Sequence, residues 1–168
     1  MNRKHLRNLT IAAMVAALYV LFTWLAAILG LSSQPIQLRF SEALCILPYF
    51  TPAAIPGLFI GCLLANLLVN ATIWDIVFGS LATLIGALGT YALRRFKWLT
   101  PLPPILANSI IIPFVIAYST LAPEAITLPL LLGYAATVGI GEILSCGVLG
   151  ILLMQTLEKY KKQLFNLS

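Results

Sequence analysis

The sequence predicts an all-α integral membrane protein, a bundle of six transmembrane helices that forms a single domain over residues 1–168. Hydrophobic residues make up 61% of the chain and charged residues only 9%, whereas a soluble domain carries roughly 25% charged residues. Apolar runs long enough to cross a bilayer alternate with short polar turns. The positions of the basic residues set the expected topology, with both termini in the cytoplasm.

The basic residues are not spread evenly along the chain. Nine of the ten lie in three clusters, before the first span, after the fourth and after the last (Arg3, Lys4, Arg7; Arg94, Arg95, Lys97; Lys159, Lys161, Lys162). A six-span path brings all three clusters to one side, and the excess of Lys and Arg in cytoplasmic loops identifies that side as the inside. The net charge of +5 therefore reports topology, and we expect no nucleic-acid partner.

The six expected spans differ in length. They cover about residues 9–31, 40–50, 54–69, 75–94, 105–121 and 130–157. The first is long enough to span, so we interpret it as a retained helix rather than a signal peptide. The second is too short to cross about 30 Å of hydrocarbon as an ideal α-helix. Pro48 and Pro52 then force a kink or a break at its inner end.

Small residues in the first span mark a surface that another helix can approach closely. Ala12 and Ala16 are spaced by four, as are Ala13 and Ala17, and the two pairs form adjacent rows on the helix. Each row either packs within the bundle or docks onto a separate membrane subunit.

The five acidic residues narrow the search for a binding site. Glu124 and Glu158 lie in polar surroundings and are expected to be solvated, which leaves Glu42, Asp75 and Glu142. Glu142 is the most informative, because an ionised carboxylate deep in a span costs roughly 2.5–3.5 kcal/mol even on the insertion scale. We interpret Glu142 as a ligand contact.

Arg39 is the one basic residue outside the three inner clusters, so an arginine on the outer side needs an explanation. It lies three residues before Glu42, and the two side chains meet on one face if Phe40 opens the helix. They form either a local ion pair or a direct contact with substrate. Arg39 is also the alternative, purely structural partner for Glu142.

Further candidates are polar or aromatic side chains near the expected outer mouth. Asp75 either caps the fourth helix or contacts a ligand, and Asn66 offers an interior amide. Trp74 and Tyr118 are either aromatic residues of the membrane interface or stacking partners for a planar ligand. Asn108 lies toward the inner end of its helix and is expected to serve helix packing.

Several chemistries are not indicated. The three cysteines lie inside apolar runs and the single histidine lies in the basic N-terminal tail, so neither a disulfide framework nor a metal site is predicted. Without a phosphate loop or a Ser/His/Asp pattern, we expect neither an enzyme nor a cofactor bound by this chain. If the protein moves a solute uphill, the energy comes from a partner or from an ion gradient. In the second case Glu142 would be the relay of a proton-coupled carrier.

Three strings carry a resemblance to a known family: LRFSEALCILPYFTPAAIPGLFIGCLLAN, WDIVFGSLATLIGAL and VGIGEILSCGVLG. They resemble the QueT family, the substrate-binding S components of energy-coupling factor (ECF) transporters that are thought to import queuosine precursors. The resemblance covers nearly the whole chain. It implies a six-helix bundle of the ECF S-component type in the bacterial plasma membrane, which captures a vitamin-like solute near the outer face.

The resemblance also implies partners and a ligand class. An S component associates with a coupling subunit of the EcfT type and two ATPases of the EcfA type, which use the ATP. The ligand would be a 7-deazaguanine or queuine; an S component for another vitamin is the alternative. The alanines that would face the coupling subunit are Ala12, Ala13, Ala16 and Ala17. The candidate substrate contacts are Glu142, Glu42, Arg39, Asp75, Asn66 and Trp74.

Overall fold

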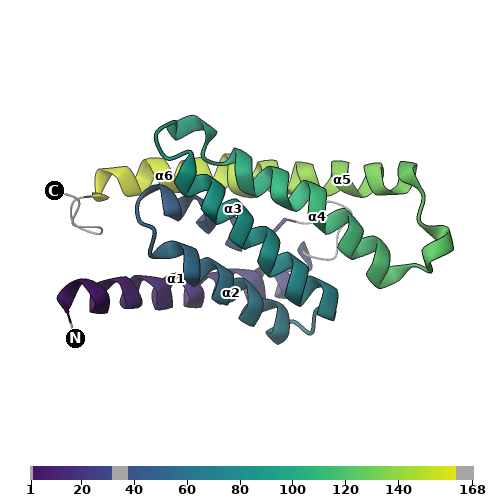
Figure 1. The fold of residues 1–168 in the computed structure, drawn as a ribbon, viewed down its shortest axis with the longest axis horizontal. Coiled ribbons are helices and arrows are strands. Elements are labelled where there is room, and N and C mark those ends of the chain that lie inside the picture. The colour runs from purple at the N-terminus through teal and green to yellow at the C-terminus, as the bar shows by residue number, and fades with distance from the viewer. Residues whose placement is uncertain (1, 32–37, 162–168) are drawn as a thin grey trace.

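The computed structural model describes residues 2–31 and 38–161. In these two ranges every regular element is a helix, which confirms the all-α prediction (Figure 1). The elements are α1 (Arg3–Ile28), η2 (Phe40–Tyr49), α2 (Ala54–Leu68), η3 (Asp75–Gly79), α3 (Ser80–Ala92), η4 (Lys97–Leu99), α4 (Leu102–Thr120), η5 (Pro123–Ala125), α5 (Leu128–Glu142), η6 (Ile143–Leu149) and α6 (Gly150–Lys159).

Helical stretches occur at all six places where the sequence predicts a span. Four of them are long and apolar enough to cross a membrane: Arg3–Ile28, Asp75–Ala92, Lys97–Thr120 and Leu128–Lys159. The other two, η2 and α2, are apolar but have only 10 and 15 residues. The structure therefore supports a multi-pass membrane protein with four full-length spans and two shorter helices.

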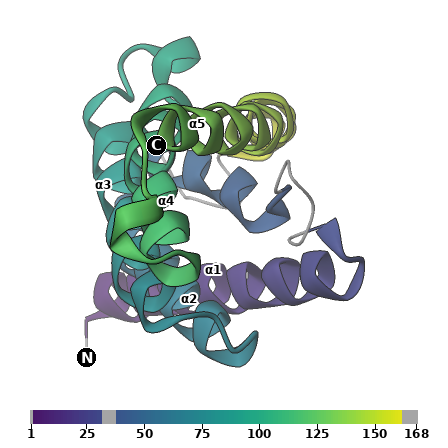
Figure 2. The same cartoon turned by 90° about the vertical axis from the view of Figure 1, so that its right-hand side faces the viewer.

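The short helix η2 lies in the middle of the bundle. Figure 1 shows α5, η6 and α6 as one long rod on one side and α1 on the other, and Figure 2 shows η2 between them. All residues from Ser41 to Pro48 are buried. Because η2 is a 3-10 helix, its ten residues reach about 20 Å instead of the 15 Å of an α-helix. Such irregular backbone is tolerated at membrane depth only where protein covers it.

The proline break after η2 agrees with the sequence prediction. Phe40 opens the helix and Arg39 occupies its N-cap position with an extended backbone. Pro48 lies in the last turn, η2 ends at Tyr49, and α2 begins five residues later at Ala54. The break thus reverses the chain, and α2 returns alongside α1.

The contact between α1 and α2 separates the two alanine rows. A Cβ atom added to Gly57 would lie 2.5 Å from the carbonyl oxygen of Ala12, and one added to Gly61 would lie 2.9 Å from the Cα of Ala16. The helices therefore touch backbone to backbone along this row. The sequence predicts that all four alanines face a coupling subunit. In the structure α2 covers the row of Ala12 and Ala16, and of the four only Ala13 and Ala17 are exposed.

Two π-helical segments interrupt the longer helices. The segment η3 runs directly into α3, and η6 joins α5 to α6. Single π-helical turns of this kind occur frequently at functional sites, because the widened turn redirects side chains. Asp75 is the first residue of η3, and Glu142 immediately precedes η6. Two of the three candidate acids therefore lie where the helix is distorted.

Candidate ligand-binding site

A cavity of about 290 Å³ opens at the end of the bundle opposite the two termini. It lies between the C-terminal parts of α1, α2 and α4 and the start of η3. Its volume is close to the lower end of the roughly 300–1,000 Å³ of small-molecule sites, which suits one small heterocycle. Three predicted contacts, Arg39, Asn66 and Asp75, line it. The other lining residues are Thr23, Ala26, Val69, Ala71, Thr72, Ile116, Ser119 and Thr120.

Asp75 is held at the cavity wall by its own turn. The hydroxyl of Thr72 donates to Oδ2 of Asp75 at 2.8 Å, and the backbone N–H of Asp75 donates to Oγ1 of Thr72 at 3.3 Å. Asp75 is the first residue of η3, whose N-cap position is occupied by Trp74, so Asp75 is not the cap. Nδ2 of Asn66 donates to the backbone carbonyl of Asp75 at 3.0 Å. These bonds orient the carboxylate and the amide together in one wall of the cavity.

Arg39 connects this cavity with Glu142. It also lines a second, much smaller cavity of about 10 Å³, together with Ile112, Val138 and Glu142, which is about the size of one water molecule. Arg39 thus shares the larger cavity with Asp75 and the smaller one with Glu142. Arg39 therefore lies between two carboxylates, one in the wall of the larger cavity and one behind it.

Glu42 differs from Glu142 in that it lines neither cavity and is enclosed by the side chains that donate to it. Only 1% of its surface is exposed. Oε1 accepts from the hydroxyl of Tyr19. Oε2 accepts from the thiol of Cys45 at 3.1 Å and from the amide of Asn108 at 3.5 Å. Donors from α1, η2 and α4 thus converge on this carboxylate.

The two buried glutamates belong to one polar network. The thiol of Cys146, in η6, lies 3.1 Å from the backbone carbonyl of Glu42 and 3.4 Å from Oε2 of Glu142. The backbone N–H of Arg39 donates to the hydroxyl of Ser145, also in η6, at 3.3 Å. The π-helical turn after Glu142 therefore ties the acids to the start of η2.

Sequence reasoning missed part of this network. Asn108 was expected to serve packing near the inner end of its helix, but its amide reaches Glu42. Tyr19 is not among the predicted site residues, although it is one of the largest fully buried side chains. A buried tyrosine hydroxyl requires a partner, so a lone tyrosine in the apolar run of the first span was the signal that could have identified it.

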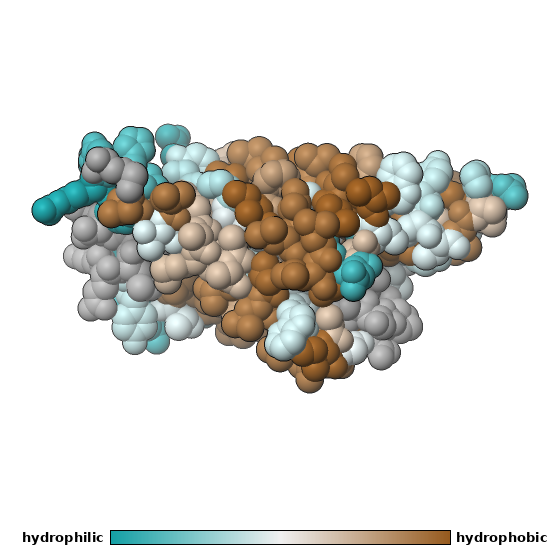
Figure 3. All heavy atoms as spheres, turned by 90° about the horizontal axis from the view of Figure 1, so that it is seen from below, coloured by the Kyte–Doolittle hydropathy of each residue, from teal (hydrophilic) through white to brown (hydrophobic). Residues whose placement is uncertain are grey.

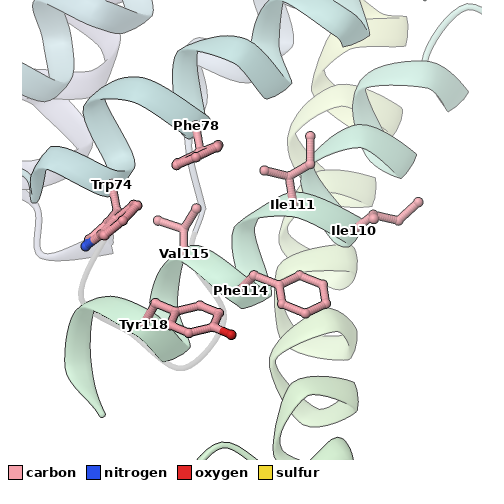
Figure 4. A pocket seen from close by; sticks show the side chains of 7 residues that line it. All are labelled: Trp74, Phe78, Ile110, Ile111, Phe114, Val115 and Tyr118. Carbon is pink, nitrogen blue, oxygen red and sulfur yellow. The ribbon is translucent and has the colours of Figure 1, made fainter. Parts of the chain in front are cut away.

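Trp74 lies apart from the other predicted contacts. It lines an apolar groove of about 390 Å³ with Phe78, Ile110, Ile111, Phe114, Val115 and Tyr118 (Figure 4). Its ring stacks on that of Phe78, with 5.8 Å between the ring centroids, and 47% of its surface is exposed. The structure therefore places Trp74 and Tyr118 in the same apolar groove, which neither Arg39 nor Asp75 lines.

Comparison with known proteins gives a consistent result. The profile of the QueT transporter family matches residues 9–159. The chain is 36% identical over 98 residues to the queuosine precursor transporter QueT of Lactococcus lactis subsp. cremoris (strain MG1363). The matched region covers 58% of this chain and 57% of that protein's length. No solved structure shows a significant match. Because the family profile spans most of the sequence, the chain belongs to the QueT transporter family.

Proposed function

We propose that this protein is the substrate-binding S component of an ECF-type importer and that it captures a 7-deazaguanine precursor of queuosine. The observation that carries the proposal is the cavity lined by Arg39, Asn66 and Asp75, with Glu142 behind Arg39, in a chain of the QueT transporter family. The Lactococcus relative is named as a queuosine precursor transporter, which supports the same ligand class.

The chemistry of a 7-deazaguanine fits the cavity wall. The N1–H and 2-amino groups of the base form a pair of donors that a carboxylate accepts in a bidentate manner, and Asp75 lines the cavity directly. The ring carbonyl accepts from Arg39, because the N–H groups of Asn66 already donate to the carbonyl of Asp75 and to the sulfur of Cys62. Apolar side chains such as Ala26 and Ile116 suit the ring faces.

Glu142 supports binding from behind Arg39. Both residues line the small cavity, whereas Glu142 does not line the ligand cavity. Its role is therefore to orient the guanidinium toward the ligand rather than to contact the ligand. Glu42, enclosed by its own donors, maintains the network on which Arg39 and Glu142 rest.

The distribution of charge supports an orientation for the molecule. Both described chain ends lie at the same end of the bundle in Figure 1, and hydrophilic side chains gather at that end in Figure 3, next to a broad apolar middle. By the positive-inside rule this end is cytoplasmic, which supports the proposal of six spans with N and C termini inside and a cavity at the outer face. Transport energy then comes from a coupling subunit of the EcfT type with two ATPases of the EcfA type, while this chain binds no cofactor of its own and catalyses no reaction.

The ligand proposal is tested by calorimetric titration of the purified protein with 7-deazaguanine bases and queuine. We expect saturable binding that is micromolar or tighter, with no competition from riboflavin, thiamine or biotin. If one of these vitamins binds and the deazaguanines do not, the protein is an S component for another vitamin. Uptake that persists without the ATPases but collapses with the proton gradient would instead identify a carrier that uses Glu142.

In the same titration, Glu142→Gln should weaken binding about tenfold, because Gln keeps the size of the side chain but no longer balances Arg39; a tenfold change corresponds to about 1.4 kcal/mol. Glu124→Gln, in the exposed helical turn η5, is the matched control and should bind like the wild type. Equal affinities of both variants at neutral pH would show that the carboxylate of Glu142 does not contribute to binding.

A bulky residue on the exposed alanine row should separate binding from transport. We expect Ala17→Trp to bind the ligand normally but to reduce uptake at least tenfold, because small residues allow close approach of a partner helix. Ala136→Trp is the control, since Ala136 is an exposed alanine of α5. Uptake that falls equally in both variants, or in neither, would argue against docking at this row.

A further inference from the structure

We propose that the end of the bundle that carries both termini has a specific binding site for the headgroup of an anionic phospholipid. A third cavity, of about 410 Å³, lies at this end. Its lining combines aromatic rings with three cations: Tyr49, Phe50, Pro52, Tyr91, Arg94, Arg95 and Lys161. These residues come from the end of η2 and the turn after it, the end of α3 and the segment after α6. The site is separate from the cavity that binds the proposed substrate.

None of the three cations forms an ion pair with a carboxylate among the described residues. Among the residues that the structure describes, the one ion pair joins Lys97 to Glu158. Glu158 also accepts from the hydroxyl of Tyr49 at 3.1 Å, so each of its oxygens already has a donor. The other four acids lie in the buried network, in the wall of the opposite cavity or in the exposed turn η5.

Aromatic rings hold two of the cations at the cavity. The guanidinium of Arg94 lies 3.9 Å from the centroid of the Tyr91 ring, and Nζ of Lys161 lies 5.7 Å from that of Tyr49. Cation–π contacts orient a cation without neutralising it. The cavity thus keeps a strong positive charge and offers several N–H donors, which is the chemistry that recognises a phosphate group.

The position of the cavity favours a lipid over a soluble anion or an acidic protein segment. It lies where η2, α3 and α6 end, beside the basic residues of two of the clusters. Leu88, one turn before Tyr91 on α3, is 50% exposed and offers an apolar surface for acyl chains. Phe96 and Trp98, just beyond α3, are more than 60% exposed, as is typical of aromatic residues at the level of the headgroups. Basic pockets between spans on the cytoplasmic side are known to accept anionic headgroups.

The proposal is tested by thermal unfolding of the full-length, delipidated protein in detergent, with added phosphatidylglycerol or phosphatidylcholine. A ligand of the folded state raises the unfolding temperature by mass action, so we expect phosphatidylglycerol to raise it by about 4 °C or more and phosphatidylcholine to leave it unchanged. Inorganic phosphate and glycerol phosphate at the same concentration should have little effect. An equal shift with these soluble anions would overturn the lipid assignment.

Charge-matched variants make the test specific to the cavity. The triple variant R94Q/R95Q/K161Q should lose the phosphatidylglycerol shift, whereas R3Q/K4Q/R7Q, which removes the same charge from the first basic cluster, should keep it. Equal losses would mean general surface attraction and would contradict a site. If the triple variant unfolds, Arg95→Gln alone should at least halve the shift. Suppose that phosphatidylglycerol does not shift the unfolding temperature of the wild type and that the triple variant fails to assemble with the coupling subunit. The cavity would then bind an acidic segment of that partner instead of a lipid.

Discussion

Replacing Arg39 with Gln is expected to weaken ligand binding about 100-fold, the largest loss of affinity among changes in the cavity wall. Arg39 lines the ligand cavity and also the small cavity in front of Glu142. A hydrogen bond to a charged group contributes roughly 1.5–3 kcal/mol. A 100-fold loss corresponds to about 2.8 kcal/mol and so lies within this range.

Titration of three arginine variants checks this prediction. Arg39→Lys keeps the charge but loses the planar fork that donates to a carbonyl or a carboxylate, so we expect an intermediate loss of about tenfold. Arg7→Gln, in the exposed first turns of α1, should bind like the wild type. If Arg39→Gln binds within threefold of the wild type while remaining monodisperse, Arg39 does not contribute to the ligand site.

The part of the site that could be predicted from the sequence follows from membrane physics. Hydropathy indicates the helical segments, and the cost of a charge in the membrane singles out Arg39 and three acids, Glu42, Asp75 and Glu142. The structure brings Arg39 and Asp75 to one cavity and places Glu142 behind Arg39. Hydropathy does not distinguish an α-helix from the 3-10 geometry of η2, because both bury the same apolar residues.

The expectations for Trp74 and for the alanine rows differ from the structure because the sequence does not show what each helix face meets. Trp74 and Asp75 are neighbours in sequence, but consecutive residues of a helix point in directions about 100° apart, so one faces the cavity and the other faces the apolar groove. Likewise, the spacing of four in α1 predicts two alanine rows but not which of them α2 will cover. Spacing along the chain gives the faces of a helix, and tertiary packing decides what each face meets.

Contacts between distant segments were the least accessible to sequence reasoning. Tyr19 and Asn108 lie 23 and 66 residues from Glu42, and all three meet in one network. Cys146 lies 104 residues from Glu42 and connects it with Glu142. No local sequence pattern predicts such a long-range contact. The sequence alone therefore ranks the acids by their depth in the membrane, but it does not distinguish an acid that stabilises the bundle from one that contacts the ligand.

The second large expected effect is a loss of folding stability when Glu42 is replaced, rather than a loss of ligand affinity. Glu42→Ala is expected to destabilise the protein by about 3 kcal/mol or more, because it removes the acceptor shared by Tyr19, Cys45 and Asn108. Each buried donor that is left unsatisfied costs roughly 1–3 kcal/mol. The measurement is the unfolding temperature of the variant in detergent, where an exposed acid such as Glu124, changed to Ala, provides the control with no expected shift.

Two companion variants decide whether Glu42 is a framework residue. Tyr19→Phe in the Glu42→Ala background removes one orphaned donor, so the double variant should be less destabilised than the sum of the two single changes. Glu42→Gln keeps an acceptor oxygen and should unfold close to the wild type. If Glu42→Gln instead abolishes ligand binding at an unchanged unfolding temperature, Glu42 contacts the ligand directly. The buried network would then extend the binding site beyond the 290 Å³ cavity, toward η2.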